Sequence, residues 1–310
     1  MRNKTPFFTV IIPNYNHAPY LRERIDSVLN QTFADFELIL LDDKSTDDSC
    51  TILRSYADNP RVTNILLNKE NSGSTFKQWQ RGFNLAKGEY IWIAESDDFA
   101  DAHFLQTAYD IITKEKDVAL LYFKSNIVNA KSEVTHQHEP KEECPYKVWE
   151  GKQFIKQSML RGNSIINASS AIFCKKFLPV SEDNLYMKFR YCGDWLFWTI
   201  IASQGNVVRV NKYYNYFRMH TAKVTPKSLI NGLRYIEGDR LLVEVTLMAK
   251  LSSFDTMKLR SLFYCDMLMD IYVDDAAKGG IGRQMKNTSV LQKALGRIFC
   301  LLKKIKQHYR

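Results

Sequence analysis

Short apolar runs alternate with longer amphipathic stretches over the first 125 residues of the chain. The apolar runs have the length of buried strands: Phe7–Ile12, Phe36–Leu41, Val62–Leu67, Tyr90–Ala94 and Val118–Phe123. Between the runs, apolar side chains recur three and four residues apart, as Leu21, Ile25 and Val28 do, which indicates helices. This alternation is typical of βαβ units and predicts an α/β fold with a mostly parallel sheet flanked by helices.

Residues that favour helix N-termini stand where these helices are expected to begin. Pro19 suits the first turn of the first helix. Asp47 and Asp48 precede the second helix, Ser74 or Thr75 the third, and Asp101 the fourth. Local sequence therefore supports the same element order as the apolar pattern.

The second half of the chain is less regular. A polar stretch from Asn129 to Tyr146 reads as a surface excursion. Further elements are then expected: an amphipathic segment at Gly151–Arg161, a strand at Ala171–Cys174, a helix at Asp194–Ser203 and a strand at Val207–Val210. Beyond Pro226 the pattern is helical, with a flexible joint at Lys278–Gly282 and a last helix at Val290–Ile305. We expect segments 1–125 and 126–226 to form the two halves of one domain, and 227–310 a helical C-terminal region.

Composition narrows the class of protein. The 310 residues are 45% hydrophobic and 25% charged, which is average for a globular protein and argues against a disordered or fibrous chain. The six cysteines are scattered, with no zinc-ligand spacing, so free thiols in a reducing compartment are expected. No apolar run approaches the length of a membrane span, and the N-terminus lacks a signal cleavage site. These features predict a cytoplasmic protein.

The net charge of +9 is concentrated at one end. Residues 276–310 hold nine basic side chains and no acidic one, so the rest of the chain is neutral. In the last predicted helix, basic residues interleave with apolar ones such as Leu291, Ile298 and Leu302, as in helices that lie on membranes. Segment 283–310 is therefore predicted to bind an anionic membrane surface, on the inner face of the cytoplasmic membrane. The alternatives are docking on its own domain or in a homodimer. A nucleic-acid partner is not expected, because the chain has no nucleic-acid-binding motif.

Two acidic clusters follow predicted strands. Asp42 and Asp43 come after the second apolar run, and Glu95, Asp97 and Asp98 after the fourth. Ligands bind at the carboxyl ends of strands in an open parallel sheet, so both clusters are expected at one edge. Carboxylates without nearby cysteine or histidine suit Mg²⁺ or Mn²⁺ bound together with a diphosphate. The simpler alternative is that these residues only cap helices.

Six segments, taken together and in order, resemble the motifs of family 2 glycosyltransferases of the GT-A fold. They are VIIPNYN (10–16), SVLNQT (27–32), LDDKSTD (41–47), NSG (71–73), AKGEYI (86–91) and ESDD (95–98). The resemblance covers roughly residues 6–225 and is strongest before Phe99. It implies a Rossmann-like GT-A domain, an inverting transfer from a nucleotide sugar, and a place in the assembly of bacterial surface polysaccharide such as lipopolysaccharide or capsule.

The resemblance also assigns roles on the donor side. The turn from Pro13 to Tyr15 and the Asp42-Asp43 pair would hold the base, with Tyr15 packed on the ring and Asp43 accepting the imide N–H of a uracil. The D-x-D signature falls on Glu95-Ser96-Asp97, so Asp97 would be the principal contact with metal or diphosphate. Glu95 departs from the usual aspartate, but its longer carboxylate would still reach a ribose hydroxyl of the nucleotide or a metal-bound water. Asp98 adjoins as a second candidate metal ligand. Lys77 or Arg81 would replace an arginine of many relatives against the diphosphate, or else lie on a solvated helix face.

On the acceptor side, Gly193-Asp194-Trp195 resembles the segment that carries the family's acidic residue. Asp194 would be the general base that deprotonates the acceptor hydroxyl, and Trp195 would form an apolar wall against the acceptor sugar. The alternatives are that Asp194 is an N-cap and the tryptophan a core residue. His220 lies in a segment similar to one near the donor diphosphate and would complete the metal shell, with Arg218 binding phosphate.

The first hypothesis is therefore an inverting, metal-dependent glycosyltransferase. It moves a sugar from a nucleotide diphosphate sugar, expected to be a UDP-sugar, to a hydroxyl of a glycan or lipid-linked glycan. A nucleotidyltransferase of similar fold is an alternative, although Pro13–Asn16 is not a glycine-rich phosphate loop. A second alternative is a non-catalytic scaffold that binds sugar nucleotides or lipids, which the Glu95 departure keeps open.

Overall fold

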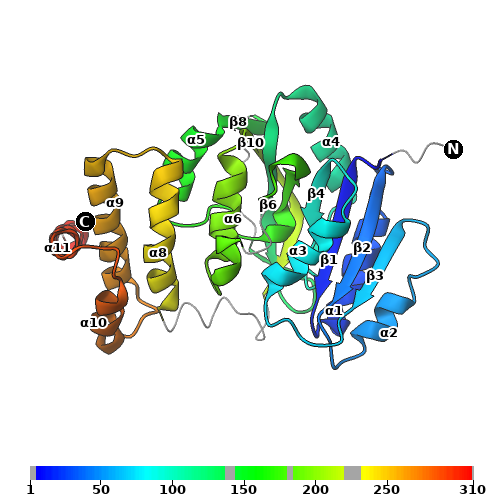
Figure 1. The fold of residues 1–310 in the computed structure, drawn as a ribbon, viewed down its shortest axis with the longest axis horizontal. Helices are drawn as coiled ribbons and strands as arrows, with labels where there is room; N and C mark the ends of the chain where they lie inside the picture. The colour runs from blue at the N-terminus through cyan, green and yellow to red at the C-terminus, as the bar shows by residue number, and fades with distance from the viewer. Residues whose placement is uncertain (1–4, 137–143, 180–183, 220–231, 309–310) are drawn as a thin grey trace. The chain divides into compact units, whose positions relative to one another are not determined.

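The computed structural model describes residues 5–136, 144–179, 184–219 and 232–308 (Figure 1). The chain forms two compact units, each assembled from separate segments. The sheet unit comprises Met1–Gly151, Ile165–Met187 and Gln204–His220, and the helical unit comprises Lys152–Ser164, Lys188–Ser203 and Thr221–Arg310. The chain thus passes between the units several times, whereas the sequence pattern suggested consecutive segments.

The sheet unit is built on a ten-stranded mixed sheet within the described residues. Its strands are β1 (Phe8–Asn14), β2 (Phe36–Asp42), β3 (Val62–Leu67), β4 (Tyr90–Ile93), β5 (Phe99–Ala100), β6 (Val118–Val128), β7 (Val134–His136), β8 (Tyr146–Glu150), β9 (Ala171–Cys174) and β10 (Asn206–Arg218). The main order is β3-β2-β1-β4-β9-β6-β10-β5, with β7 beside β6 and β8 beside β10. The first four strands are mutually parallel, and β9 runs antiparallel to β4 and β6.

Helices cover both faces of the parallel part of the sheet. They are α1 (Ala18–Leu29), α2 (Ser49–Arg54), α3 (Thr75–Leu85) and α4 (Phe104–Lys114). Successive strand residues point to opposite faces. Val10 and Ile12 share a core cluster with residues of α1, α2 and α4. Ile11 instead faces α3, where a Cβ on Gly82 would lie 2.6 Å from its side chain.

The expected strands are confirmed, with differences that come from the second half of the chain. The strand expected at Val207–Val210 extends to Arg218, and β6 extends past Phe123 to Val128. Both extensions run side by side in parallel, so each supplies the other's backbone hydrogen bonds. Polar residues occupy much of these extensions, and for that reason an apolar pattern does not reveal them.

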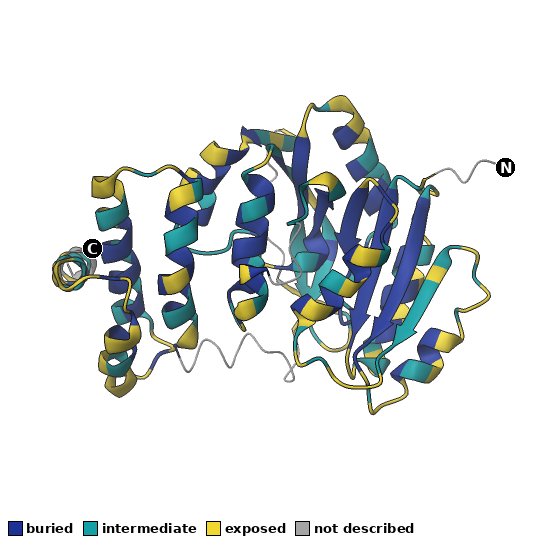
Figure 2. Cartoon of the chain, viewed as in Figure 1, coloured by how far each residue is buried: buried dark blue, intermediate teal, exposed yellow. Residues whose placement is uncertain are grey.

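The helical unit contains most of the short helix α5 (Gly151–Phe154), which leads into a π-helix at Ile155–Met159, and five longer helices among its described residues. These are α6 (Gly193–Ala202), α8 (Leu233–Met248), α9 (Ser253–Met269), α10 (Asp275–Gln284) and α11 (Val290–His308). The apolar faces are shared between neighbouring helices, which show buried and exposed sides in Figure 2. Helix α11 packs closely on α9, because a Cβ on Gly296 would lie 2.6 Å from the carbonyl oxygen of Ser261. The helical C-terminal region is therefore confirmed.

The flexible joint expected at Lys278–Gly282 is wrong, because this segment lies inside α10. The side chain of Asp274 caps the helix by accepting the N–H of Ala276 at 3.0 Å. Gly282 is buried, and a Cβ there would lie 2.8 Å from the hydroxyl of Tyr264. The glycine thus permits close packing rather than flexibility. In the part of the chain that the structure describes, no helix is both long enough and apolar enough to cross a bilayer.

Candidate active site

The candidate donor site lies at the edge where β1, β2 and β4 end. Because these strands are parallel neighbours, the residues that follow them meet at the same edge of the sheet. Asp43 follows β2 directly, and Asp97 follows β4 by a short loop. The two acidic clusters therefore lie at the same sheet edge, as expected, because β2 and β4 both neighbour β1.

Asp42 holds the turns after β1 and β2 together. Its carboxylate is fully buried and accepts the side-chain amide of Asn14 at 2.8 Å. It also accepts the N–H and the hydroxyl of Ser45, at 2.8 and 2.6 Å. Asn14 in turn lies at the end of β1, so Asp42 fixes the shape of this edge from within. Because Asp42 is 0% exposed, its carboxylate is not accessible to a ligand.

Asp43 is surrounded by donors that the sequence reasoning missed. Its carboxylate accepts the amide of Asn68 at 2.7 Å and the amide of Gln78 at 2.7 Å. Ser72 adds its N–H and its hydroxyl, both at 2.8 Å. Three of these bonds go to Oδ1 and only one to Oδ2, so Oδ2 retains acceptor capacity. The network orients Asp43 rigidly at the rim of the sheet.

Two further donor-side candidates lie at the surface of this edge. Tyr15 is 48% exposed, as a ring that packs on a ligand base must be. Pro13, two residues before it, is buried in β1. Lys77 is exposed on the first turn of α3, and its ammonium donates to the carbonyl oxygen of Ser72 at 3.2 Å. Lys77 is thus tied to the same loop as Asp43.

The acidic residues after β4 have different surroundings. Glu95 accepts the indole N–H of Trp79 at 2.9 Å. Asp98 is 1% exposed, and its carboxylate accepts the amide of Asn167 at 2.8 Å and the hydroxyl of Ser169 at 2.7 Å. The N–H of Arg218 binds the other oxygen of Asp98 at 3.0 Å. Asp98 therefore joins the β4 loop, the 167–169 turn and β10.

A buried arginine offsets the charge of this acidic cluster. Arg24 on α1 is fully buried, and its Nε donates to the carbonyl oxygen of Glu95 at 2.9 Å. Its guanidinium lies 5.2 Å from the ring centroid of Trp92. Burial lowers the pKa of Arg24 to about 10, and the nearby carboxylates of Asp98 and Asp97 oppose that shift. No pattern in the sequence singled out Arg24, because it occupies a core position of an amphipathic helix.

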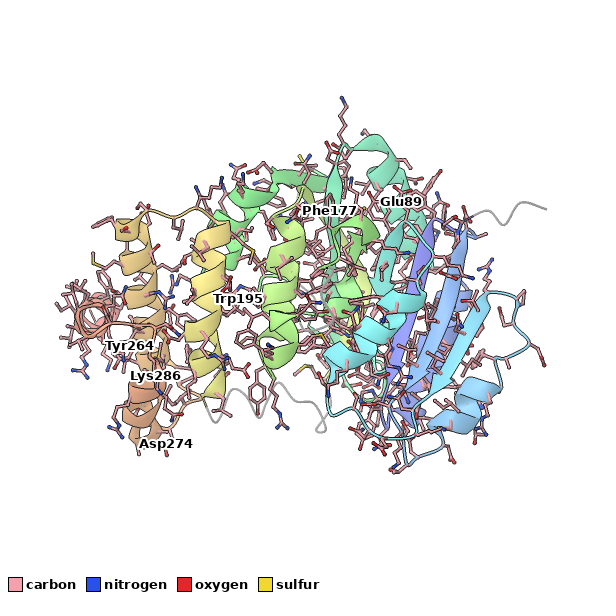
Figure 3. The ribbon with its side chains drawn as sticks, in the orientation of Figure 1. Glu89, Phe177, Trp195, Tyr264, Asp274 and Lys286 are labelled. Atoms are coloured by element: carbon pink, nitrogen blue, oxygen red, sulfur yellow. The ribbon has the colours of Figure 1, made fainter. Side chains whose placement is uncertain are left out.

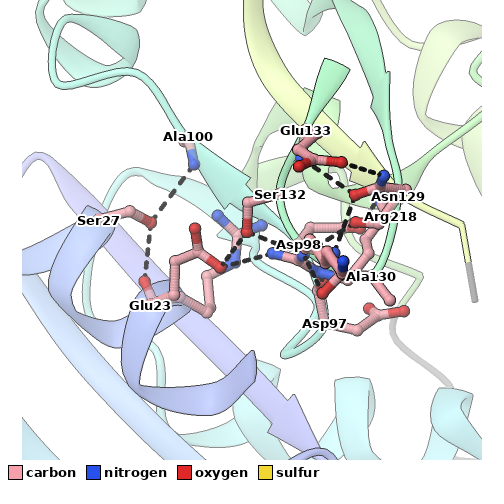
Figure 4. A network of polar contacts seen from close by, with 12 residues as sticks. Glu23, Ser27, Asp97, Asp98, Ala100, Asn129, Ala130, Ser132, Glu133 and Arg218 are labelled. Atoms are coloured by element: carbon pink, nitrogen blue, oxygen red, sulfur yellow. Dashed lines mark hydrogen bonds and ion pairs between the residues drawn. The ribbon is translucent and has the colours of Figure 1, made fainter. Parts of the chain in front are cut away.

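Arg218 anchors the loop of Asp97 and Asp98 (Figure 4). Its side chain is 0% exposed, and Nε donates to the carbonyl oxygen of Asp97 at 2.7 Å. Its Nη2 forms an ion pair of 2.5 Å with Glu23, and Nη1 donates to the carbonyl oxygen of Asn129 at 3.1 Å. The expectation that Arg218 binds a phosphate is therefore wrong, because its donors are used inside the protein.

Few protein side chains are available here as metal ligands. Among the described residues, no group of three or more histidine, cysteine, aspartate or glutamate side chains is placed to hold a metal ion. Mg²⁺ characteristically uses one or two carboxylates and takes its other ligands from phosphate and water, so a single protein carboxylate fits this chemistry. His220, the other expected ligand, lies outside the described residues.

The candidate base belongs to the helical unit. Asp194 lies in the first turn of α6 and keeps part of its surface exposed. One oxygen accepts the N–H of Trp195 at 2.8 Å, and the other accepts the side-chain amide of Asn163 at 2.9 Å. Burial raises the pKa of Asp194 to about 6. The N-cap position is held by Cys192, so Asp194 is not the simple N-cap of the alternative interpretation.

Glu237 on α8 fixes the backbone that leads into α6. Its carboxylate accepts the N–H groups of Arg190 and Tyr191 at 2.8 Å and that of Cys192 at 3.0 Å. These N–H groups precede the helix and have no partner within it. Glu237 therefore positions the segment that carries Asp194, and its distance in sequence explains why the pattern did not reveal it.

Trp195 does not form the expected wall for an acceptor sugar. Only 4% of its surface is exposed, and its indole N–H donates to the carbonyl oxygen of Met159 at 2.8 Å. Its ring centroid lies 6.4 Å from that of Phe263 on α9. Figure 3 shows Trp195 on α6. The tryptophan is a core residue of the helical unit, as the alternative interpretation held.

Several characterised and uncharacterised glycosyltransferases are similar to part of this chain. Glycosyltransferase GlyG of Streptococcus pneumoniae is 37% identical over 109 residues, 35% of this chain and 36% of that protein. Poly(ribitol-phosphate) beta-glucosyltransferase of Bacillus spizizenii is 33% identical over 125 residues, 40% of this chain and 20% of that protein. Hyaluronan synthase of Pasteurella multocida is 33% identical over 128 residues, 41% of this chain and 13% of that protein. The matches thus span about a third or less of these relatives.

The fold is also similar to that of solved structures. S. aureus TarS 1-349, in complex with UDP-GlcNAc, superposes with a TM-score of 0.68 at 20% identity, covering 93% of this chain and 83% of that one. The complex of the same TarS fragment with UDP gives a TM-score of 0.63 at 20% identity, over 84% and 71% of the two chains. The GT-A fold is thereby confirmed.

The sequence profile of the family described as "Glycosyl transferase family 2" matches residues 9–178, more than half of the chain. This range contains all but the first residue of β1, the whole of β2 to β4, both acidic clusters and the 167–169 turn that holds Asp98. The chain belongs to glycosyl transferase family 2.

Proposed function

We propose that the protein transfers a sugar from a UDP-sugar to a hydroxyl group of a glycan or lipid-linked glycan, with inversion at the anomeric carbon. The observation that carries the proposal is the common sheet edge, where an exposed Tyr15, an oriented Asp43 and the Asp97 loop follow parallel strands. This edge is where open α/β sheets bind nucleotides.

On the donor side, each residue has a distinct proposed task. Tyr15 packs on the base, and Oδ2 of Asp43 accepts its imide N–H, because Oδ1 already takes three hydrogen bonds. Lys77 faces the diphosphate from the same loop. The proposed acceptor is a glycan or a lipid-linked glycan, and the proposed role is in surface polysaccharide synthesis.

Asp97 is the proposed protein ligand of Mg²⁺ or Mn²⁺. Asp98 is a weaker candidate, because its carboxylate accepts three hydrogen bonds that hold the loop together. When bound, a divalent cation offsets the negative charge that develops on the leaving diphosphate. Arg24 contributes a fixed positive charge near the same carboxylates.

Asp194 is the proposed general base. A carboxylate takes the proton of the attacking hydroxyl best when its pKa lies near the working pH, and burial brings that of Asp194 to about 6. The hydroxyl oxygen then bonds to the anomeric carbon as the bond to the diphosphate oxygen breaks. A single displacement of this kind inverts the anomeric centre.

Release of UDP tests the proposal. The purified protein is incubated with a panel of nucleotide sugars and either Mg²⁺ or Mn²⁺, and free nucleoside diphosphate is measured. We expect slow hydrolysis of one UDP-sugar, abolished by a chelator and by Asp97→Ala. Release of pyrophosphate instead would indicate a nucleotidyltransferase, and tight sugar-nucleotide binding without turnover would indicate a scaffold.

We also propose that α11 binds an anionic membrane surface. One side of α11 packs on α9, yet the opposite side leaves Leu291, Ile298 and Leu301 more than half exposed. Exposed basic residues such as Arg297 and Lys304 flank them. An exposed apolar stripe flanked by basic residues is the pattern of helices that lie in the headgroup region of a membrane.

A further inference from the structure

A pocket of about 610 Å³ lies within the helical unit. Residues 156–164 form one wall, and residues 250–262, from the end of α8 into α9, form the other. The volume is typical of pockets that bind small ligands. None of the residues assigned above to the donor lines this pocket.

The charged side chains in the lining of the pocket are mostly basic. Four of its side chains are basic (Lys156, Arg161, Lys250, Lys258), against a single carboxylate from Asp255. Arg161 is neutralised by an ion pair with Asp266. The three lysines form no ion pair with any residue that the structure describes, so their charge is left for a ligand. Leucines make up much of the remaining lining: Leu160, Leu251, Leu259 and Leu262.

Two locally unfavourable backbone features border the pocket. The first is the π-helix at Ile155–Met159, a rare geometry that recurs at functional sites. The second is Lys250, which has a φ of 48° in the left-handed region that glycine usually fills at the end of a helix. Both features place a basic side chain, Lys156 or Lys250, in the lining. Glycine is favoured at the backbone conformation of Lys250. A contact between the lysine side chain and a ligand would explain why a lysine stands there.

The pocket is connected to the proposed base. Asn163 lines it and also donates the 2.9 Å hydrogen bond to Oδ2 of Asp194. Asn163 therefore belongs both to the lining of the pocket and to the hydrogen bonds of the proposed base. We propose that this pocket is the acceptor subsite and that it binds a phosphate group of the acceptor, with the leucines contacting the apolar part attached to that phosphate. This inference rests on the proposed transferase function and specifies its acceptor class.

Binding of a simple amphiphilic anion tests the inference. The probes are n-octyl phosphate below its micellar concentration, inorganic phosphate, and n-octyl glucoside as the uncharged control, all titrated by calorimetry. We expect n-octyl phosphate to bind more tightly than either of the other two. Tighter binding of n-octyl phosphate than of inorganic phosphate points to a lipid-linked phosphate, whereas equal binding of the two points to a water-soluble phosphorylated glycan.

The variant Lys156→Gln/Lys258→Gln removes two of the unpaired charges. Both side chains are exposed, so the fold should be retained, and the affinity for n-octyl phosphate should fall about tenfold. The matched control, Lys152→Gln/Lys286→Gln, loses the same charge at exposed positions outside the lining and should bind as the native protein does.

Release of UDP without acceptor separates this inference from the proposed function. UDP release is measured on the native protein, and n-octyl phosphate binding is measured on the native protein and on the double variant at Lys156 and Lys258. Unchanged affinity for n-octyl phosphate in that variant, or no binding of either phosphate probe to the native protein, would overturn the inference even if UDP release continues. Failure of UDP release alone would instead count against the transferase proposal.

Discussion

The side-chain amide of Asn163 donates a hydrogen bond of 2.9 Å to Oδ2 of Asp194. This bond favours the ionised carboxylate and so opposes the effect of burial, which raises the pKa of Asp194 to about 6. A general base works only when deprotonated. We therefore expect the rate of transfer in the native protein to fall as the pH drops through about 6.

Replacement of Asn163 by alanine removes the opposing hydrogen bond. The pKa of Asp194 should rise further, so the acid limb of the pH–rate profile should move to higher pH. The measurement is kcat/KM from pH 5 to 9 for the native protein and for Asn163→Ala. A lower rate at every pH with an unmoved acid limb would mean that Asn163 has only a structural role.

Replacement of Asp194 by asparagine tests the base directly. The amide keeps the size of the side chain but cannot accept a proton, so we expect at least a ~10²-fold loss of transfer. Donor affinity, measured by titration with UDP, should stay unchanged because Asp194 is not assigned to the donor. Weaker UDP binding in Asp194→Asn would show that the residue belongs to the donor site instead.

Asp97 and Asp98 are adjacent, yet they should respond differently to the same change. The carboxylate of Asp98 accepts hydrogen bonds from Asn167, Ser169 and the N–H of Arg218. An asparagine accepts through only one of its two side-chain atoms, so Asp98→Asn leaves at least one of these buried donors without an acceptor. The free energy of unfolding should therefore fall by about 1–3 kcal/mol. Asp97→Asn removes the proposed metal ligand and should abolish metal-dependent UDP release. Thermal melting and UDP release of the two variants form a matched pair, and the reverse pattern would exchange their assigned roles.

The parallel core and the acidic sheet edge could be predicted from sequence, because both depend on local patterns. Apolar runs of strand length mark β1 to β4, and short polar motifs follow them. The partners of those motifs come from distant segments. Arg24 lies on an apolar helix stripe, and Glu237 reaches Cys192 across 45 positions. No local pattern indicates such contacts, since they form only when the chain is folded.

Errors arose where packing overrides local preference. The glycines of Lys278–Gly282 suggest a joint, yet the segment is helical, and Gly282 is buried against Tyr264 within α10. Trp195 follows the proposed base and looked like a ligand contact, whereas its indole completes the core with Phe263. In both cases the residue type is compatible with two environments, and only the neighbouring helix decides between them.

Lys250 offers a test of whether strain is retained for function. Lys250→Gly relieves a left-handed backbone and should raise the free energy of unfolding by about 1 kcal/mol while weakening n-octyl phosphate binding. Lys250→Ala removes the same side chain but keeps the strained backbone, so it should weaken binding without stabilising the fold. Denaturant unfolding and calorimetry distinguish the two variants. Unchanged binding in both would remove Lys250 from the proposed subsite.

The exposed stripe of α11 should determine membrane binding. Ile298 and Leu302 are both 51% exposed, so Ile298→Gln/Leu302→Gln should leave thermal melting unchanged. The same variant loses the apolar contact with the headgroup region, and its flotation with vesicles that contain anionic lipid should be largely lost. Ile166→Gln, at a position that is 77% exposed in the sheet unit, is the control and should float as the native protein does.

Because basic side chains near an anionic surface contribute about 1 kcal/mol each, high salt should also reduce the flotation of the native protein. Equal flotation of the native protein and the α11 variant would show that this stripe does not contact lipid.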